Sequence, residues 1–275
     1  MPLAVCATPI GNLDDVTLRV LRELAEADLV LCEDTRRTRV LLDRHGIEAR
    51  VESYHRLNEA TRVPSLVARL KRGERVALVS DAGLPGVNDP GARLIAAAVA
   101  AGLGVTVLPG PSAVETALVA SGLLAEEYRF VGYLPRRDAE RRALAAALAR
   151  FGDAIVAFES PRRLPGSLAV LAEAMPDRPV AVCRELTKRF EEVVRGRLDE
   201  VAEAFRDPPR GEITLVLGRF VVEVRDVSEV AIRTVAELVE AGVPRKQAVD
   251  VVARLTGAAR NTLYRASLQQ LRDTR

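Results

Sequence analysis

Four clusters of polar residues, glycine and proline follow short apolar runs in the first 115 residues, and they are the segments best suited to chemistry. They span residues 8–12, 33–36, 80–91 and 109–113. The third cluster, from Ser80 to Gly91, holds three glycines, two prolines, two aspartates and one asparagine. Glycine lets a backbone approach a ligand closely, and an aspartate places a carboxylate beside it. A single cluster of this kind would be an ordinary turn, but this composition predicts a ligand-binding loop over residues 80–91.

Three common motifs are absent from the sequence. There is no Gly-x-Gly-x-x-Gly after the first apolar run, no Gly-x-x-x-x-Gly-Lys-Ser/Thr and no Gly-x-Ser-x-Gly. The first two absences argue against the common dinucleotide-binding fold and against a P-loop nucleotide hydrolase. The third argues against a serine nucleophile held on a strand-to-helix elbow.

Cysteine and histidine usage argues against a metal site. The three cysteines, Cys6, Cys32 and Cys183, are widely spaced within apolar runs, which is typical of buried thiols in a reducing cytosol. His45 and His55 have no second ligand at metal-binding spacing. No apolar run approaches the ~18 residues of a membrane span. We therefore expect a cytoplasmic protein with no metal and no membrane contact, whose first apolar run is a strand and not a signal peptide.

Alternating strand and helix patterns must position the four clusters. Strands are predicted at residues 3–7, 29–32, 50–54, 76–80 and 105–108, and helices at 15–27, 38–44, 61–71, 92–101 and 113–119. This alternation predicts βαβ units around a mainly parallel sheet, and apolar runs without polar alternation indicate strands covered on both faces. Ligands bind at the carboxyl ends of the strands in such sheets, which is where the clusters fall.

Two further regions follow along the chain. Strands at 130–133, 154–158, 180–184, 192–195 and 213–217, with helices at 139–150, 164–173 and 198–206, predict a second α/β domain. An all-helical region begins at Ser228, is interrupted at 242–244 and 256–257, and continues as helices at 246–255 and 259–271. We therefore predict an N-terminal α/β domain over 1–120, a C-terminal α/β domain over 121–220, and a helix-turn-helix-like extension over 228–275.

The motifs, taken in order, resemble the ribosomal RNA small subunit methyltransferase I family, the 16S rRNA cytidine 2′-O-methyltransferases of the tetrapyrrole-methylase superfamily. The resemblance covers residues 2–218 and departs from the family's usual pattern at Phe158, where tyrosine is common, and at Arg162, where histidine is frequent. The matching stretches are T-P-I-G-N-L (8–13), C-E-D-T-R (32–36), A-L-V-S-D-A-G (77–83), P-G-P-S-A (109–113), G-Y-L-P-R (132–136), F-E-S-P-R-R-L (158–164), C-R-E-L-T-K (183–188) and G-E-I-T-L (211–215).

The resemblance implies two α/β domains with S-adenosylmethionine in the cleft between them, and a homodimer. Asp81 is expected in the wall of the cofactor pocket, with Asn88 and Asp89 further out, where the substrate enters. Mapped onto this sequence, the cofactor-binding residues are Pro9, Ser80, Asp81, Ala82, Gly83, Ser112, Ala113, Phe158, Glu159, Gly211, Glu212 and Ile213.

A ribose hydroxyl is a poor nucleophile while it is protonated. A carboxylate or a neutral lysine can take its proton, and a cation can stabilise the developing alkoxide. Candidates at strand ends are Asp34, Glu159, Glu185 and Lys188. We hypothesise that Glu159 or Glu185 orients the catalytic site and that Lys188 stabilises the alkoxide.

The formal net charge of the chain is only +2, so the charge of the whole molecule does not indicate an RNA partner. The local arginine clusters do favour one. Guanidinium groups bind phosphates and stack on bases. The expected substrate is small-subunit ribosomal RNA, either in an assembled subunit, which we favour, or as free RNA. The alternative is a solvated surface of ion pairs, or, for the C-terminal helices, a packing appendage. The candidate RNA-binding residues are Arg36, Arg37, Asn88, Arg136, Arg162 and Arg163 beside the predicted cavity, and Arg245, Lys246 and Arg260 in the C-terminal helices.

Two other functions compete with this interpretation. A siroheme- or corrin-type methyltransferase of the same fold needs neither basic loops nor a helical tail, and such relatives usually carry a glycine-rich first loop and a Gly-Gly-Asp-Pro third loop. This chain has T-P-I-G and S-D-A-G at those places. A non-catalytic nucleic-acid-binding regulator would not need so many intact loops at strand ends.

Overall fold

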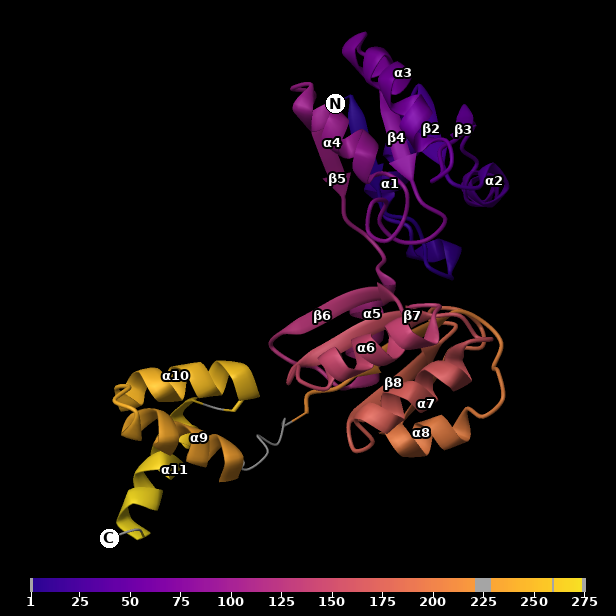
Figure 1. Ribbon diagram of the computed structural model, residues 1–275. Coiled ribbons are helices and arrows are strands. Elements are labelled where there is room, and N and C mark those ends of the chain that lie inside the picture. Colours follow the sequence, from indigo (N-terminus) through magenta and orange to yellow (C-terminus); the bar gives the residue numbers. More distant parts are fainter. Residues whose placement is uncertain (1, 221–228, 259, 274–275) are drawn as a thin grey trace. The chain divides into compact units, whose positions relative to one another are not determined.

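The structure is a computed structural model that describes residues 2–220, 229–258 and 260–273. The chain divides into two compact units, Met1–Phe220 and Val221–Arg275. Figure 1 shows two separate sheets in the first unit and a group of helices in the second. Within these described ranges, no helix is long and apolar enough to cross a membrane.

The first sheet is entirely parallel. Its strand order is β3-β2-β4-β1-β5, and every neighbouring pair runs in the same direction. All residues of β1, β2 and β4 are buried, which explains why these runs lack polar alternation. The strands are β1 (Leu3–Cys6), β2 (Leu29–Cys32), β3 (Val51–Ser53), β4 (Val76–Val79) and β5 (Val105–Leu108).

Helices cover both faces of this sheet, as the sequence predicted. One face packs into a core with α3 (Glu59–Lys71) and α4 (Ala92–Ala100), through residues such as Leu66 and Leu94. The other packs into a core with α1 (Leu18–Glu26) and α2 (Thr35–Arg44). A short 3-10 helix, Leu13–Asp15, precedes α1. The two-sided covering leaves the carboxyl ends of the strands free to carry loops.

The second sheet is mixed, which the sequence did not specify. Its order is β6-β7-β10-β8-β9; β6 and β7 are parallel, and the remaining neighbours are antiparallel. Helices α6 (Asp138–Leu148), α7 (Leu164–Ala174) and α8 (Leu198–Ala204) share its larger core. The strands are β6 (Tyr128–Tyr133), β7 (Ala154–Glu159), β8 (Pro179–Arg184), β9 (Glu192–Arg197) and β10 (Ile213–Leu217).

Helix α5 (Ala113–Ser121) packs against the second sheet, although the sequence analysis grouped it with residues 1–120. Its residues Val114, Ala117 and Leu118 share a core with Ala154 and Val156 of β7. The chain therefore leaves the first sheet after β5 and reaches the second at α5, through residues 109–112. The apolar residues of α5 are the physical reason, because they are buried mainly against the strands of the second sheet.

The second unit is a three-helix cluster with its own core. Helices α9 (Glu229–Glu240), α10 (Arg245–Thr256) and α11 (Arg260–Asp273) pack through Val235, Val249 and Leu263, each fully buried. Gly257 caps α10 in the left-handed conformation, as expected of a glycine after a helix end. The predicted helix starts at Ser228 and Ala259 lie outside the described residues.

Candidate active site

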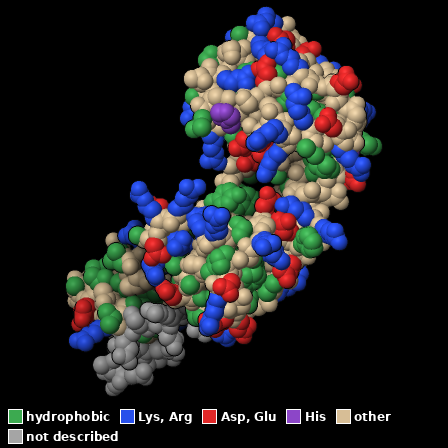
Figure 2. All heavy atoms as spheres, turned by 90° about the vertical axis from the view of Figure 1, so that its right-hand side faces the viewer, with side chains coloured by type: hydrophobic (Ala, Val, Ile, Leu, Met, Phe, Trp, Pro, Cys, Tyr) green, Lys and Arg blue, Asp and Glu red, His purple; other side chains and the backbone are tan. Residues whose placement is uncertain are grey.

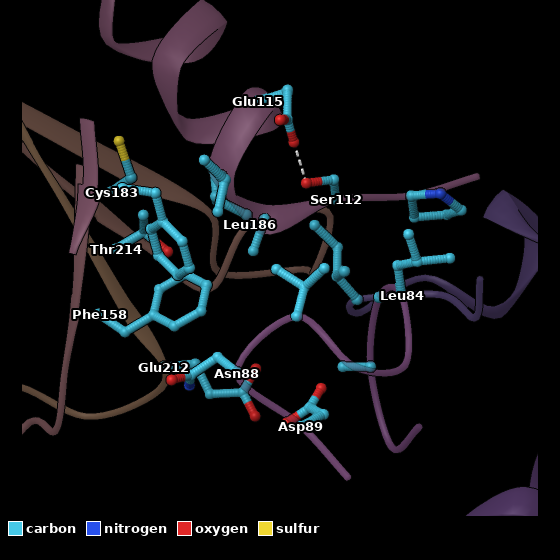
Figure 3. Close-up of a pocket in the computed structure, with 18 of the residues that line it drawn as sticks. Leu84, Asn88, Asp89, Ser112, Glu115, Phe158, Cys183, Leu186, Glu212 and Thr214 are labelled. Carbon is cyan, nitrogen blue, oxygen red and sulfur yellow. Dashed lines mark hydrogen bonds between the residues drawn. The ribbon is translucent and has the colours of Figure 1, made fainter. Parts of the chain in front are cut away.

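Loops of both sheets enclose a cavity of about 580 Å³ within the first unit (Figure 3). From the first sheet come Ile10, residues 82–84 and 87–89, and residues 109–112; α5 and the second sheet supply most of the rest. Three of the four clusters singled out in the sequence thus meet at the cavity, and only the cluster at 33–36 does not line it. A cavity of this size and mixed lining suits a small organic ligand.

Nine of the twelve predicted cofactor-binding residues line the cavity, and three do not. Pro9, Ser80 and Asp81 lie outside its wall. The nine that line it are Ala82, Gly83, Ser112, Ala113, Phe158, Glu159, Gly211, Glu212 and Ile213.

Ser80 stabilises the conformation of the loop over residues 80–91. Its side chain is buried, and its Oγ donates hydrogen bonds to the carbonyls of Ala82 at 3.2 Å and Gly83 at 3.1 Å. Thr8 Oγ1 donates to the Ser80 carbonyl at 2.9 Å, and the backbones of Thr8 and Gly83 pair as an isolated bridge. The first and third clusters are thereby joined, with Pro9 directly after the bridge.

Asp81 points away from the cavity, contrary to the prediction that it forms the pocket wall. Its Oδ1 accepts a hydrogen bond from the Asp34 backbone N–H at 3.0 Å, and its Oδ2 lies 3.5 Å from Arg37 Nη1. The side chain therefore serves the start of α2. Asn88 and Asp89, which were expected further out, line the cavity instead.

Four carboxylates line the cavity: Asp89, Glu115, Glu159 and Glu212. Neighbouring donor groups hold Glu115 and Glu159 in place. Glu115 accepts hydrogen bonds from Ser112 Oγ and, at 2.7 Å, from the Tyr128 hydroxyl. Burial raises the pKa of Glu115, but these hydrogen bonds outweigh burial and leave it below its usual value. Glu159 is buried, accepts from the Ser160 N–H at 2.7 Å and from Ser167 Oγ, and forms an ion pair with Arg163.

The third carboxylate, Glu212, belongs to a cluster with Glu185 and Lys188. Lys188 Nζ lies 2.9 Å from Glu185 Oε1 and 3.1 Å from Glu212 Oε2, and Glu185 Oε1 also accepts from the Glu212 N–H at 2.9 Å. Neither Glu185 nor Lys188 lines the cavity. Of the three predicted catalytic residues, only Glu159 therefore reaches it.

Protonation within this cluster favours charged forms. The hydrogen bond from Lys188 and that from the Glu212 backbone lower the pKa of Glu185. Burial lowers the pKa of Lys188, but its hydrogen bonds to Glu185 and Glu212 outweigh burial and raise the pKa overall. Lys188 is therefore a fixed cation and not the neutral base that the sequence analysis also considered.

Asp89, the fourth carboxylate, has a raised pKa. Burial raises the pKa of Asp89 most, and the nearby carboxylates of Glu33 and Asp81 raise it further. The Arg56 cation and a hydrogen bond with Ser80 lower it, and the resulting pKa is about 6. A carboxyl of this kind exchanges protons near neutral pH. Sequence reasoning missed this role because Asp89 was placed at the entrance on loop order alone.

Backbone strain gathers in the loops around the cavity. Among the described residues, the only non-glycine residues with positive φ are Asn88 at 65°, Glu185 at 53° and Thr187 at 64°. Asn88 lines the cavity, and the loop with Glu185 and Thr187 adjoins Leu186, which lines it too. Such conformations cost free energy and concentrate at functional sites.

Aromatic and aliphatic side chains form the remaining walls. Phe158 packs edge-on against Phe130 at 4.9 Å and against Tyr133 at 5.6 Å between ring centroids. Tyr133 is 58% exposed although it lines the cavity, so part of its ring faces solvent. Tyr133 belongs to the stretch G-Y-L-P-R, yet no spacing rule in the sequence marked it or the aliphatic wall residues Leu84, Val87, Val114 and Leu186.

Most of the predicted RNA-binding arginines have acidic or carbonyl partners within the chain. Arg36 pairs with Asp34, Arg37 with Asp81, Arg163 with Glu159 and Arg260 with Asp250, and Arg245 donates to the Ser267 carbonyl. Figure 2 shows Lys and Arg side chains interspersed with Asp and Glu over one face. Across the ranges that the structure describes, ion pairs are absent for four predicted cations: Arg136, Arg162, Arg245 and Lys246. Of these, Arg245 has its carbonyl partner.

Among the cysteines and histidines, Cys183 is the one residue that lines the cavity. The three cysteines are free thiols and buried, and Cys183 lines the cavity. In the described part of the chain, no group of three or more His, Cys, Asp or Glu side chains is arranged to hold a metal ion.

Comparisons with known proteins agree with this architecture. The profile described as Tetrapyrrole (Corrin/Porphyrin) Methylases matches residues 2–202, and the RsmI C-terminal HTH domain matches residues 226–272. The solved structure of uroporphyrin-III C-methyl transferase from Thermus thermophilus, complexed with S-adenyl homocysteine, superposes with a TM-score of 0.55 at 23% identity. That match covers 79% of this chain and 97% of the other. The first unit thus has the tetrapyrrole-methylase fold, as the sequence analysis expected.

Two relatives narrow the class. A Ribosomal RNA small subunit methyltransferase I from Mycobacterium bovis is 46% identical over 276 residues, covering 99% of this chain and 96% of that protein. One from Thermotoga maritima is 43% identical over 216 residues, covering 78% of this chain and 97% of that protein. The chain belongs to the ribosomal RNA small subunit methyltransferase I family.

Proposed function

We propose that this protein transfers the methyl group of S-adenosylmethionine to the ribose 2′-oxygen of a cytidine in 16S ribosomal RNA. The observation that carries the proposal is the cavity: nine residues mapped from the family's motifs line one space, together with Asn88 and Asp89. The relatives' name supports a methyltransferase acting on small-subunit ribosomal RNA. The cytidine and the 2′-oxygen rest on the motif resemblance.

The residues of the cavity fit the proposed cofactor. Aliphatic side chains such as Leu84, Val114 and Leu186 offer an apolar wall for a planar base, and Glu115 and Glu212 offer negative charge to a ligand that carries an ammonium and a sulfonium. When bound, the cofactor supplies an electrophilic methyl group on positively charged sulfur. A fold relative holds S-adenyl homocysteine, the demethylated form of the same compound.

The residues of the chain itself bind the ligand, orient it and exclude water from the cavity. Ser80 and Thr8 fix the loop that carries Gly83, so that the cavity wall is formed before a ligand arrives. Ser112 and Tyr128 fix the Glu115 carboxylate in the same way. Such preorganisation lowers the entropy that two bound molecules must lose to react.

The partners follow from the same proposal. The substrate is small-subunit ribosomal RNA within an assembled subunit, in the cytoplasm, and the enzyme acts as a homodimer as the family resemblance implies. Exposed Arg162, beside the cavity-lining Pro161, and Lys246, at the start of α10, are free of ion pairs among the described residues and suit phosphate contacts.

The proposal is tested by methyl transfer to purified small subunits from a strain that lacks the gene. Tritiated S-adenosylmethionine is the donor, and the modified nucleotide is mapped by primer extension at limiting dNTP and by mass spectrometry of nucleosides. The expected product is one 2′-O-methylcytidine per subunit. A methylated base, or transfer to uroporphyrin III with none to subunits, would overturn the proposal. Free 16S RNA in parallel distinguishes the two forms of substrate.

A further inference from the structure

We propose that the Asp89 carboxylate accepts the proton of the ribose 2′-hydroxyl as the methyl group is transferred. The inference rests on the proposed function and assigns to it a catalytic residue that the family motifs did not single out. It depends on where Asp89 lies, on what engages the other carboxylates, and on the loop that holds it.

Of the four carboxylates that line the cavity, Glu159 and Glu212 each pair with a cation, whereas Glu115 and Asp89 have no ion pair among the described residues. Glu115 is engaged by two hydroxyl donors, Glu159 by an N–H, a hydroxyl and Arg163, and Glu212 by Lys188. Asp89 has a hydrogen bond with Ser80, whereas Glu115 has two hydroxyl donors, so Asp89 is the less engaged of the two carboxylates without a cation.

The loop carries Asp89 to the line where the two sheets meet. Asn88 precedes it in a left-handed conformation, and its Oδ1 lies 3.1 Å from the place where a Cβ on Gly132 would stand. Gly132 belongs to the irregularity where the β6–β7 register shifts between Phe130 and Tyr133. The loop of the first sheet thus reaches strand β6 of the second. Figure 3 shows Asn88, Asp89, Glu212 and Phe158 in the same part of the cavity.

The neighbouring side chains give that part of the cavity the character of a nucleoside site. The Tyr133 ring is half exposed beside Phe158, so one face is open for a base to stack on it. Arg56 donates a hydrogen bond to the Asn88 carbonyl and pins the loop from outside. A ribose attached to a base on Tyr133 would bring its hydroxyls toward Asn88 and Asp89.

The charges around Asp89 suit a base at neutral pH. Glu33 and Asp81 face it from the ends of β2 and β4, and Arg56 faces it from the segment after β3. Glu159, Glu212 and Tyr133 also line the cavity. Burial and the two acidic neighbours raise the pKa of Asp89 to about 6. The carboxylate is therefore mainly ionised at pH 7.5, yet more basic than an ordinary aspartate.

The step balances without a further reactant. A bond forms between the 2′-oxygen and the methyl carbon, the methyl–sulfur bond breaks, and its electron pair remains on sulfur as a neutral thioether. The hydroxyl proton passes to the Asp89 carboxylate and is released to water when the products leave.

The first test compares Asp89→Asn, Asp89→Glu and the wild type in single-turnover methylation of small subunits. The matched control is Asp43→Asn, the same change at an exposed residue of α2. We expect Asp89→Asn to be slower by about 100-fold or more, as for a lost general base. Asp89→Glu should recover part of the rate, and the control should match the wild type. Calorimetric affinity for S-adenosylmethionine should change less than about threefold in every variant.

The second test follows protonation directly. The wild-type rate should fall as pH drops through about 6, because protonated Asp89 cannot accept a proton, and Asp89→Asn should lose that dependence. Carboxyl carbon NMR of ¹³C-aspartate-labelled enzyme without ligand should show one aspartate titrating near 6, absent from Asp89→Asn.

The outcomes separate the two proposals. Wild-type enzyme that modifies no ribose overturns the proposed function. Wild-type enzyme that modifies ribose while Asp89→Asn keeps its rate and pH profile overturns only the role of Asp89. An aspartate signal that titrates below 4.5 in every sample also overturns it.

Discussion

Carboxylates in one small space have different protonation behaviour because their donors differ. Lys188 and a backbone N–H hold Glu185 ionised, whereas Asp89 has acidic neighbours and burial against it. Groups whose environments drive their pKa values apart can take different parts in one reaction. At this scale, the cluster of Glu185, Lys188 and Glu212 is a structural clamp that fixes the cavity-lining Glu212, and Asp89 is the reactive group.

The clamp predicts a pH-dependent contribution of Glu185 to stability. Its folded-state pKa is lowered, so the stability that it adds is complete above its ordinary pKa of about 4.5 and is lost as the pH falls through the lowered value. Glu185→Gln should lower the free energy of unfolding by about 1–2 kcal/mol at pH 7. Urea unfolding at pH 7 and pH 3 measures this, with Glu48→Gln, at an exposed residue, as the control. A difference from wild type that is equal at both pH values contradicts the clamp.

Sequence could place the ligand loop but not the direction of its side chains. The composition of residues 80–91 identified a ligand loop, and five predicted residues at 82–83, 112–113 and 158 do line the cavity. Asp81 and Asp89 exchange their expected places because the α2 N-terminus offers the Asp34 N–H to Asp81. Such a contact joins residues 47 positions apart, and nothing in the local pattern of either reveals it.

At the scale of elements, the β and α patterns predicted nearly every strand, because buried parallel strands are read as continuous apolar runs. The direction of the strands in the second sheet was not predicted, since β7, β8 and β10 have the same apolar character in either direction. Likewise, α5 is an apolar helix whose own sequence does not say on which sheet it packs. Its place is decided by the apolar surface that β7, β8 and β10 present.

One buried arginine fastens the ends of several elements in the second sheet. Arg178 is fully buried; its Nε donates to the Gly218 carbonyl, and its Nη1 to those of Leu148 and Phe151, each at 3.0 Å. Its Nη2 donates to the Asp153 carbonyl. Burial lowers the pKa of Arg178 to about 10, so it remains charged at neutral pH. The ends of α6 and β10 and the approach to β7 thus share one hub.

Removing the Arg178 guanidinium should destabilise the second sheet where α6 and β10 end and β7 begins. Arg178→Leu removes the guanidinium donor from four buried or part-buried carbonyls, and we expect a loss of about 3–5 kcal/mol in the free energy of unfolding. Arg178→Lys should lose less, because an ammonium still satisfies some of them. Urea denaturation gives both values. Arg206→Leu, at an exposed ion pair on the surface, should cost under about 1 kcal/mol; a similar loss in Arg206→Leu and Arg178→Leu would contradict the hub.

At the scale of the whole molecule, the arrangement of charge bears on RNA binding more than its sum. Asp and Glu nearly balance Lys and Arg, 38 against 40, and most of the predicted RNA-binding arginines already have partners. RNA phosphates must therefore compete with internal carboxylates at those sites. Arg162 has no ion pair in the described part of the chain and follows the cavity-lining Pro161.

Arg162 should consequently contact a phosphate. Arg162→Gln is expected to weaken binding of small-subunit RNA about three- to tenfold and to reduce the slope of log K against log salt by about 1. Filter binding across a series of KCl concentrations measures both. Arg206→Gln, which removes a surface arginine paired with Glu203, is the control. An unchanged slope for Arg162→Gln would remove this residue from the RNA interface, whatever happened to the affinity.

The division into two units predicts that methyl-donor binding and RNA affinity can be separated. The cavity is lined wholly by residues of the first unit, and the C-terminal helices close their own core around Val235, Val249 and Leu263. A chain that ends at Phe220 should therefore bind S-adenosylmethionine within about twofold of the full chain, as calorimetry would show. It should bind small subunits about tenfold more weakly and with a shallower salt dependence, because the cations of α10 and α11 are gone. Loss of donor binding in a truncated chain that still unfolds cooperatively would show that the helices complete the cavity, and equal affinity for subunits would show that they do not contact RNA.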